Sequence, residues 1–183
     1  LKWLADQMKM VEHPRDMEQE AVSVADSGGV YIVPAFSGLG APWWQSDVKG
    51  AVFGLTFATT RAHFLRAALE SIAYQIRDLV DAMTQATGAP LKEICADGGP
   101  TKNKFLMQFQ ADLLQTPVVC TEVEDASALG AVIMNGFARK VWHSFDEVIP
   151  LRKVTKVIQP RQNETVETLY QGWREAVNQL IRK

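Results

Sequence analysis

Residues 93–114 read EICADGGPTKNKFLMQFQADLL, and this stretch decides the fold. The apolar run over 94–96 predicts a strand that ends at Asp97-Gly98-Gly99, and apolar spacing predicts an amphipathic helix over 101–114. Paired glycines let the backbone approach a ligand closely because no Cβ stands in the way. The helix start offers free N–H groups and a positive dipole end. The stretch therefore suggests a seat for part of a nucleotide, although paired glycines also form ordinary turns.

Charged residues flank these glycines. Asp97, at the end of the strand, is placed to orient a ribose or a metal-bound water, and it can equally fix the turn through its own backbone. Lys102 and Lys104 fall in the first helical turn, where the helix dipole disfavours a cation. Their position suggests an anionic neighbour, and a solvated lysine is the alternative.

Strands alternate with helices outward from this stretch, which predicts an α/β domain. Further strands are expected over 30–33, 51–55 and 116–121, and further helices from Thr59 or Thr60 to Gly88, from 125 through 131, and over 164–181. The long helix should bury one face formed by Leu65, Leu69, Ile72, Ile76, Leu79 and Met83. Residues 13–24 suit an exposed helix or loop, and residues 37–50 an irregular loop in which Trp43 and Trp44 pack structurally or plug a cleft.

Composition narrows the class of protein. The 183 residues suit one domain, and the formal net charge of −2 with 22% charged residues lacks the basic patch of a nucleic-acid binder. The sequence contains no long uncharged apolar run, so no membrane helix is predicted. Cys95 and Cys120 lack metal-ligand spacing and predict buried, reduced thiols in a cytosolic protein. Residues 1–8 already read as mid-helix without a cap, so we expect a chain cut from a longer protein.

Familiar catalytic arrangements are missing from the sequence. His13, His63 and His143 are scattered without metal-ligand spacing, so each is expected at the surface or in a cap. Neither GxxxxGK[ST] nor GxGxxG occurs. Ser37 does not sit in a nucleophile elbow. The residues alone therefore show none of the familiar catalytic arrangements, and we predict no metal site within the 183 residues.

Several spaced segments together resemble one family, the FGGY carbohydrate kinases, and within it most closely the members that phosphorylate glycerol. The segments are GAVFGLTFATTRAHFLRAALE at 50–70, ESIAYQIRD at 70–78, DGG at 97–99, LMQFQADLL at 106–114, VPAFSGLGAPWW at 33–44 and ALGA at 128–131. The resemblance covers nearly the whole chain, from about residue 1 to residue 173.

The resemblance implies a ribonuclease H-like (actin-like ATPase) fold, of which residues 1–183 form the C-terminal part of the second domain, truncated at its N-terminus. It implies ATP, with Mg²⁺, as the phosphoryl donor. Gly99 and Asn103 would contact the adenosine part of ATP, and Gly98 would shape the turn. Lys2 aligns with a glutamine of the family near the nucleotide, which puts a role for this position in doubt, although a lysine can still reach a phosphate.

The resemblance also implies what this stretch leaves to the rest of a kinase. The catalytic aspartate, the polyol contacts and the phosphate loops would lie upstream, so the 183 residues alone are expected to be inactive. Missing strands would leave open sheet edges, so we expect a homo-oligomer. We expect the protein to be located in the cytoplasm. The alternatives are a kinase of the xylulose, ribulose or gluconate type and a non-catalytic actin-like module.

Overall fold

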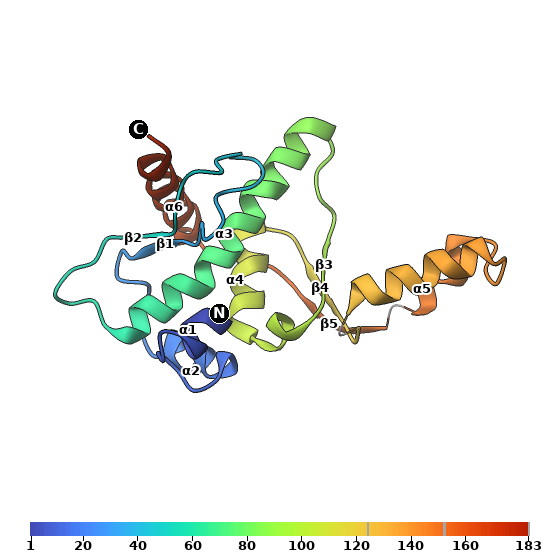
Figure 1. Cartoon of the computed structure of the whole chain (residues 1–183), viewed down its shortest axis with the longest axis horizontal. Coiled ribbons are helices and arrows are strands. Elements are labelled where there is room, and N and C mark those ends of the chain that lie inside the picture. Colours follow the sequence, from blue (N-terminus) through green and yellow to red (C-terminus); the bar gives the residue numbers. More distant parts are fainter. Residues whose placement is uncertain (124, 152, 183) are drawn as a thin grey trace.

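Helices form most of the regular secondary structure in the computed structural model, which describes residues 1–123, 125–151 and 153–182 (Figure 1). The α-helices are α1 (Lys2–Asp6), α2 (Met17–Val22), α3 (Arg61–Thr87), α4 (Lys104–Leu114), α5 (Ala126–Ala138) and α6 (Thr165–Ile181). Short 3-10 helices are η1 (Pro14–Asp16), η2 (Gly99–Lys102), η3 (Phe145–Glu147) and η4 (Ile149–Leu151). The strands are β1 (Tyr31–Val33), β2 (Ala51–Phe53), β3 (Ile94–Ala96), β4 (Val118–Thr121) and β5 (Val154–Ile158).

Helix α3 runs through the body of the molecule, as its apolar spacing predicts (Figure 1). Thr60 is its N-cap, and Gly88 ends it in the left-handed conformation with φ 66°. Leu65 and Leu69 are fully buried. The expected burial of the whole apolar face is wrong, however, since the side chains of Leu79 and Met83 are exposed. The last turns of α3 extend beyond the elements that cover its first half.

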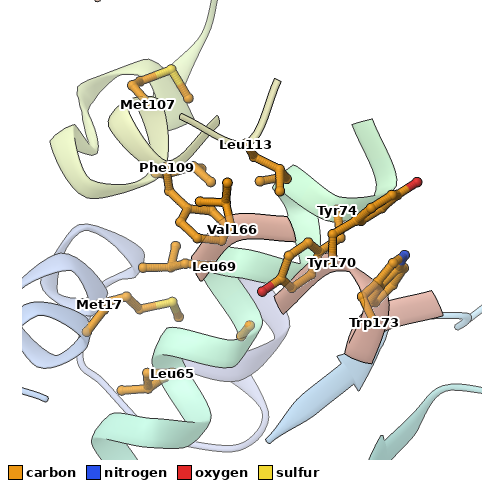
Figure 2. Close-up of a cluster of buried hydrophobic side chains, with 14 of the residues drawn as sticks. Met17, Leu65, Leu69, Tyr74, Met107, Phe109, Leu113, Val166, Tyr170 and Trp173 are labelled. Carbon is orange, nitrogen blue, oxygen red and sulfur yellow. The ribbon is translucent and has the colours of Figure 1, made fainter. Parts of the chain in front are cut away.

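The core lies where α3, α4 and α6 meet (Figure 2). Tyr74 is its central ring: the centroid of Trp173 lies 5.5 Å away in a stacked arrangement, and that of Phe109 lies 5.6 Å away edge-on. Met17 of α2 packs beside Leu65 and Leu69 with no exposed surface. The predicted exposure of residues 13–24 is therefore wrong for α2, because this short helix buries one face against α3.

Two small sheets flank the helices. Strands β1 and β2 pair antiparallel, and the second sheet has the order β3-β4-β5. Within it β3 and β4 are parallel, as expected for strands joined through a helix, while β5 adds antiparallel to β4. Sequence reasoning missed β5, because four of its five residues are exposed and carry no burial signal. Cys120 is buried, but Cys95 is exposed on the edge strand β3, which corrects the expectation for that thiol.

A buried carboxylate fixes the irregular loop over residues 37–50. Asp78 of α3 accepts hydrogen bonds from the indole N–H groups of Trp43 at 3.0 Å and Trp173 at 2.9 Å, and from the hydroxyl of Tyr170 at 2.6 Å. These bonds join the loop, α3 and α6. Trp43 therefore has the structural role, whereas Trp44 is 75% exposed and fills no part of the core.

Helix α5 lies apart from the body, to the right in Figure 1. Val132 and Met134 expose most of their side chains, and a Cβ on Gly130 would have no neighbour within 4 Å. Gly130 thus does not mark a close approach to another element, whereas Gly136, farther along α5, lies directly against the ring of Trp142. No helix among the described residues combines the length and the apolar character needed to cross a membrane.

Candidate functional site

A cavity of about 460 Å³ opens between the turn after β3 and the N-terminal segment of the chain. Its lining residues come from α1, η1, α2 and the β3–α4 turn, and they are Leu1, Lys2, Pro14, Arg15, Glu18, Gly99, Pro100, Lys102 and Asn103. Gly99 and Asn103, the two residues expected to contact the adenosine part of ATP, therefore line one cavity, whereas Gly98, the residue expected to shape the turn, does not line it. The remote N-terminal segment supplies the opposite wall.

The two glycines of the turn differ in what they do. Gly98 has φ 78° and ψ −176°, a conformation that side chains rarely adopt, and its carbonyl accepts a hydrogen bond from the Thr101 hydroxyl at 2.7 Å. Gly99 lies outside the left-handed region, and a Cβ added there would meet nothing within 4 Å. The backbone therefore needs glycine at Gly98, whereas at Gly99 the missing Cβ leaves room in the cavity.

Asn103 is both the N-cap of α4 and part of the cavity wall. Its Oδ1 accepts from the backbone N–H of Leu106 at 2.8 Å. Because the atom facing that N–H must be an oxygen, the side chain presents Nδ2 as its remaining donor. No group in the described chain accepts a hydrogen bond from this Nδ2. Asn103 can therefore donate to a ligand while it holds the helix start.

The free N–H groups expected at the start of the helix are not free. The helix begins at Lys104, three residues later than predicted, after the 3-10 turn η2. Glu18 of α2 accepts at Oε1 from the backbone N–H of Lys104 at 3.0 Å and of Phe105 at 3.3 Å. The anionic neighbour suggested by the lysines is thus a protein carboxylate, and this helix start does not offer a phosphate seat.

Asp97 ties the glycine turn to α5. Its Oδ2 accepts from the backbone N–H of Ala126 at 3.0 Å, and Asp125 caps the same helix through a bond from Ala128 N–H at 2.9 Å. Asp97 does not line the cavity that contains Gly99 and Asn103. Its observed role is therefore to connect two elements, which neither of the roles considered from sequence describes.

Exposed cations lie on the N-terminal side of the cavity. Lys2 and Arg15 both line it, and the guanidinium of Arg15 lies 3.8 Å from the carboxylate of the exposed Asp16. Sequence reasoning considered Lys2 but missed Arg15, Pro14 and Glu18. These three belong to a polar stretch without periodicity, and no local motif distinguishes them. Lys2 and Arg15 on the N-terminal side, together with Lys102 at the end of η2, give the cavity three cations with long side chains beside the uncharged Gly99 and Asn103. This combination suits a ligand with a neutral ring and an anionic tail.

His63 has a structural role. His63 accepts at Nδ1 from the backbone N–H of Thr60 at 3.1 Å, so it caps α3 as expected for a capping histidine. Among residues 1–123, 125–151 and 153–182, no cluster of three or more histidine, cysteine, aspartate or glutamate side chains is arranged to hold a metal ion.

Comparison with known proteins gives a consistent family. Residues 1–139 match the C-terminal domain of the FGGY family of carbohydrate kinases. A glycerol kinase from Bacillus licheniformis is 45% identical over 179 residues, which are 97% of this chain and 36% of that protein. A glycerol kinase from Xylella fastidiosa is 46% identical over 182 residues, or 99% of this chain and 36% of that protein. The chain thus spans little more than a third of these relatives.

Solved structures share the fold. The crystal structure of Plasmodium falciparum glycerol kinase with ADP matches with a TM-score of 0.85 and 34% identity, covering all of this chain and 36% of that one. Gluconate kinase from Lactobacillus acidophilus matches with a TM-score of 0.83 over 98% of this chain and 37% of that one. At 24% identity this second likeness shows the fold alone. The α/β, ribonuclease H-like fold expected from the sequence is the fold of these neighbours.

Proposed function

The chain belongs to the FGGY family of carbohydrate kinases, and from this we propose that it is the nucleotide-binding, C-terminal portion of an ATP-dependent kinase that phosphorylates glycerol. The relatives that are 45% to 46% identical are glycerol kinases, and this chain aligns with only 36% of their length. We assign residues 1–183 to a domain truncated at its N-terminus, with the remainder of the kinase supplied by the rest of a longer polypeptide.

One observation carries the nucleotide assignment. Gly99, whose missing Cβ leaves open space, and Asn103, with an amide donor for which the described residues provide no acceptor, line the same cavity. We assign this cavity to the adenosine part of ATP, with Gly98 holding the turn. Asn103 would donate to a ring or ribose acceptor, and Lys2 or Arg15 is available to the anionic tail. The fit is supported by a solved relative, 34% identical, that was crystallised with ADP.

The phosphoryl-transfer centre is assigned to residues outside this chain. Mg²⁺ in kinases is held through the phosphates and a few carboxylates, and the described residues offer no cluster of potential metal ligands. The base that takes the proton from the acceptor hydroxyl is likewise expected elsewhere in the polypeptide. We therefore propose that MgATP enters with its adenosine end on this chain, and that the 183 residues alone do not catalyse transfer.

A pair of assays tests this assignment. The intact protein, incubated with ATP, Mg²⁺ and glycerol, should release ADP and form glycerol phosphate, and it should prefer glycerol in a panel with xylulose, ribulose and gluconate. Preference for a sugar would move the assignment to another member of the family. No ATP-dependent transfer to any acceptor would indicate a non-catalytic actin-like module. Turnover by residues 1–183 alone would contradict the assignment of the phosphoryl-transfer centre to residues outside this chain.

We also infer a homo-oligomer. Strands β3 and β5 are the two edges of their sheet in the described chain, and α5 exposes Val132 and Met134. Open edges and apolar surface favour association. Sedimentation velocity of residues 1–183 over a concentration series should show particles that contain more than one copy. A monomer at every concentration would refute the inference.

We place the kinase in the cytoplasm, where ATP and a reducing environment are available. Cys95 and Cys120 are not joined in a disulfide, as that environment allows. Fractionation of cells that express the tagged protein should recover it with cytoplasmic markers.

A further inference from the structure

We propose that Glu18 is a positioning residue of the nucleotide site, which closes the N-terminus of α4 to anions and fixes Asn103 at the cavity wall. The inference rests on the proposed function, since it concerns the residue that orders the nucleotide contact. Glu18 lies on α2, 85 positions before Asn103 along the chain, and both side chains line the same cavity.

The N–H groups in the first turn of α4 are all used. N–H groups at a helix start have no partner within the helix. Those of Lys104 and Phe105 donate to Glu18 Oε1 at 3.0 Å and 3.3 Å, and that of Leu106 donates to Asn103 Oδ1 at 2.8 Å. A phosphate would have to displace a carboxylate that already has two hydrogen bonds and the favourable end of the helix dipole. The start of α4 is therefore closed to an anionic ligand.

Packing holds Glu18 in this position. Its neighbour Met17 is completely buried against α3. Arg66 of α3 donates from Nη1 to the carbonyl of Val24, just after α2, at 2.7 Å, and its guanidinium lies 4.8 Å from the ring centre of Phe105 on α4. Helices α2, α3 and α4 are thus joined around one arginine. The Glu18 carboxylate reaches α4 from a rigid support rather than from a loose loop.

This arrangement determines what Asn103 can offer a ligand. With Oδ1 engaged by the helix, the side chain presents only the donor Nδ2 to the cavity. The Glu18 carboxylate in the same wall disfavours a phosphate at this end. The α4 side of the cavity therefore favours an uncharged acceptor, such as a ring nitrogen or a ribose oxygen, and the phosphates are directed away from α4 toward Lys2 and Arg15 on the N-terminal side. Loss of Glu18 would leave two donors open beside Asn103 and loosen the helix start.

The test is steady-state kinetics of the intact kinase with Glu18→Ala, Glu18→Gln and Glu18→Asp. Removing both charge-assisted bonds in Glu18→Ala should raise the KM for ATP about tenfold while the KM for glycerol changes far less. Glu18→Gln keeps an oxygen acceptor at the same reach and should restore most of the ATP affinity. Glu18→Asp is shorter by one methylene and should behave more like Glu18→Ala. Inorganic phosphate should compete with ATP better in Glu18→Ala than in the wild type.

Glu20→Ala provides the matched control. Glu20 lies on the same helix and pairs with Arg61 away from the cavity, so its loss should leave the KM for ATP unchanged. An unchanged KM for ATP in Glu18→Ala, or an equal rise of both KM values in all variants, would overturn the role of Glu18. If Glu18→Ala does not fold, equal ATP affinities of Glu18→Gln and Glu18→Asp would overturn it. A wild-type protein without kinase activity would instead refute the proposed function.

Discussion

Replacing Gly99 by alanine tests whether this glycine is needed for ATP binding and not for folding, in contrast to its neighbour Gly98. A Cβ at Gly99 would meet no atom within 4 Å, and the backbone there is outside the left-handed region. Alanine in a compatible conformation stabilises a protein by roughly 0.4–1 kcal/mol because the unfolded chain loses freedom. For a protein of this size that corresponds to a rise in Tm of about 1–4 °C. The folded structure should therefore tolerate Gly99→Ala without loss.

ATP binding, by contrast, should be weakened by Gly99→Ala. The added methyl group enters the cavity that also contains Asn103, and a displacement of about 1 Å in a positioned ligand can cost up to about 100-fold in rate. We expect the KM for ATP of the intact kinase to rise by about one to two orders of magnitude at an unchanged KM for glycerol. The assay couples ADP release to a spectrophotometric readout over a series of ATP concentrations.

Gly98→Ala is the contrasting variant. Alanine at φ 78° and ψ −176° costs about 1–3 kcal/mol of backbone strain, so this variant should lose stability whether or not a ligand is present. Gly99→Ala with the KM for ATP of the wild type would refute the assignment of the cavity. A fall in Tm for Gly99→Ala as large as for Gly98→Ala would refute the distinction between the two glycines.

Three further substitutions test other parts of the structure. Asn103→Asp keeps a capping oxygen for Leu106 but replaces the Nδ2 donor, so calorimetry should show little change in Tm while the KM for ATP rises about tenfold. Asp78→Ala removes the acceptor of three donors at a buried site and should lower the urea unfolding free energy by about 3 kcal/mol, against less than about 1 kcal/mol for the exposed control Asp81→Ala. Burial raises the pKa of the Glu70 carboxyl above its ordinary value of 4.5, although bonds from Arg66 and Tyr74 oppose this, so the folded state binds the extra proton. Stability should therefore fall as the pH rises from 4.5 through the raised pKa, and Glu70→Gln should flatten that part of a urea unfolding series; an identical slope in both proteins would contradict the assignment.

Sequence periodicity predicts the elements whose signal is local. The apolar faces of α4 and α6 follow from steps of three and four residues, and the Gly98-Gly99 turn follows from its position after an apolar run. The same periodicity was wrong for the end of α3, because it reports that Leu79 and Met83 suit a buried face but not which element covers them. Strand β5 has almost no buried residue and hence no signal of either period.

The far wall of the cavity could not be predicted for a different reason. Glu18 acts on Lys104 across 86 positions, and Arg15 lines the cavity through the fold of η1 rather than through a motif. Neither residue differs in sequence from an ordinary solvated charge. Only the packing of α2 on α3 brings them to the glycine turn.

The two lysines at the start of α4 now have a physical explanation. Cations near a helix N-terminus are unfavourable, and a bound phosphate is the usual compensation. Here the Glu18 side chain takes the place of a bound anion, because it accepts from the backbone of Lys104 itself. Because the N–H groups at this helix start already have protein acceptors, they are not available to the phosphates of a ligand. The affinity of this wall must therefore come from uncharged contacts such as Asn103 Nδ2 and the open space at Gly99. It follows that adenosine should compete for the site without any phosphate, and that AMP should exceed it only by what Lys2 and Arg15 contribute. Pyrophosphate should compete poorly, because it makes neither of these uncharged contacts.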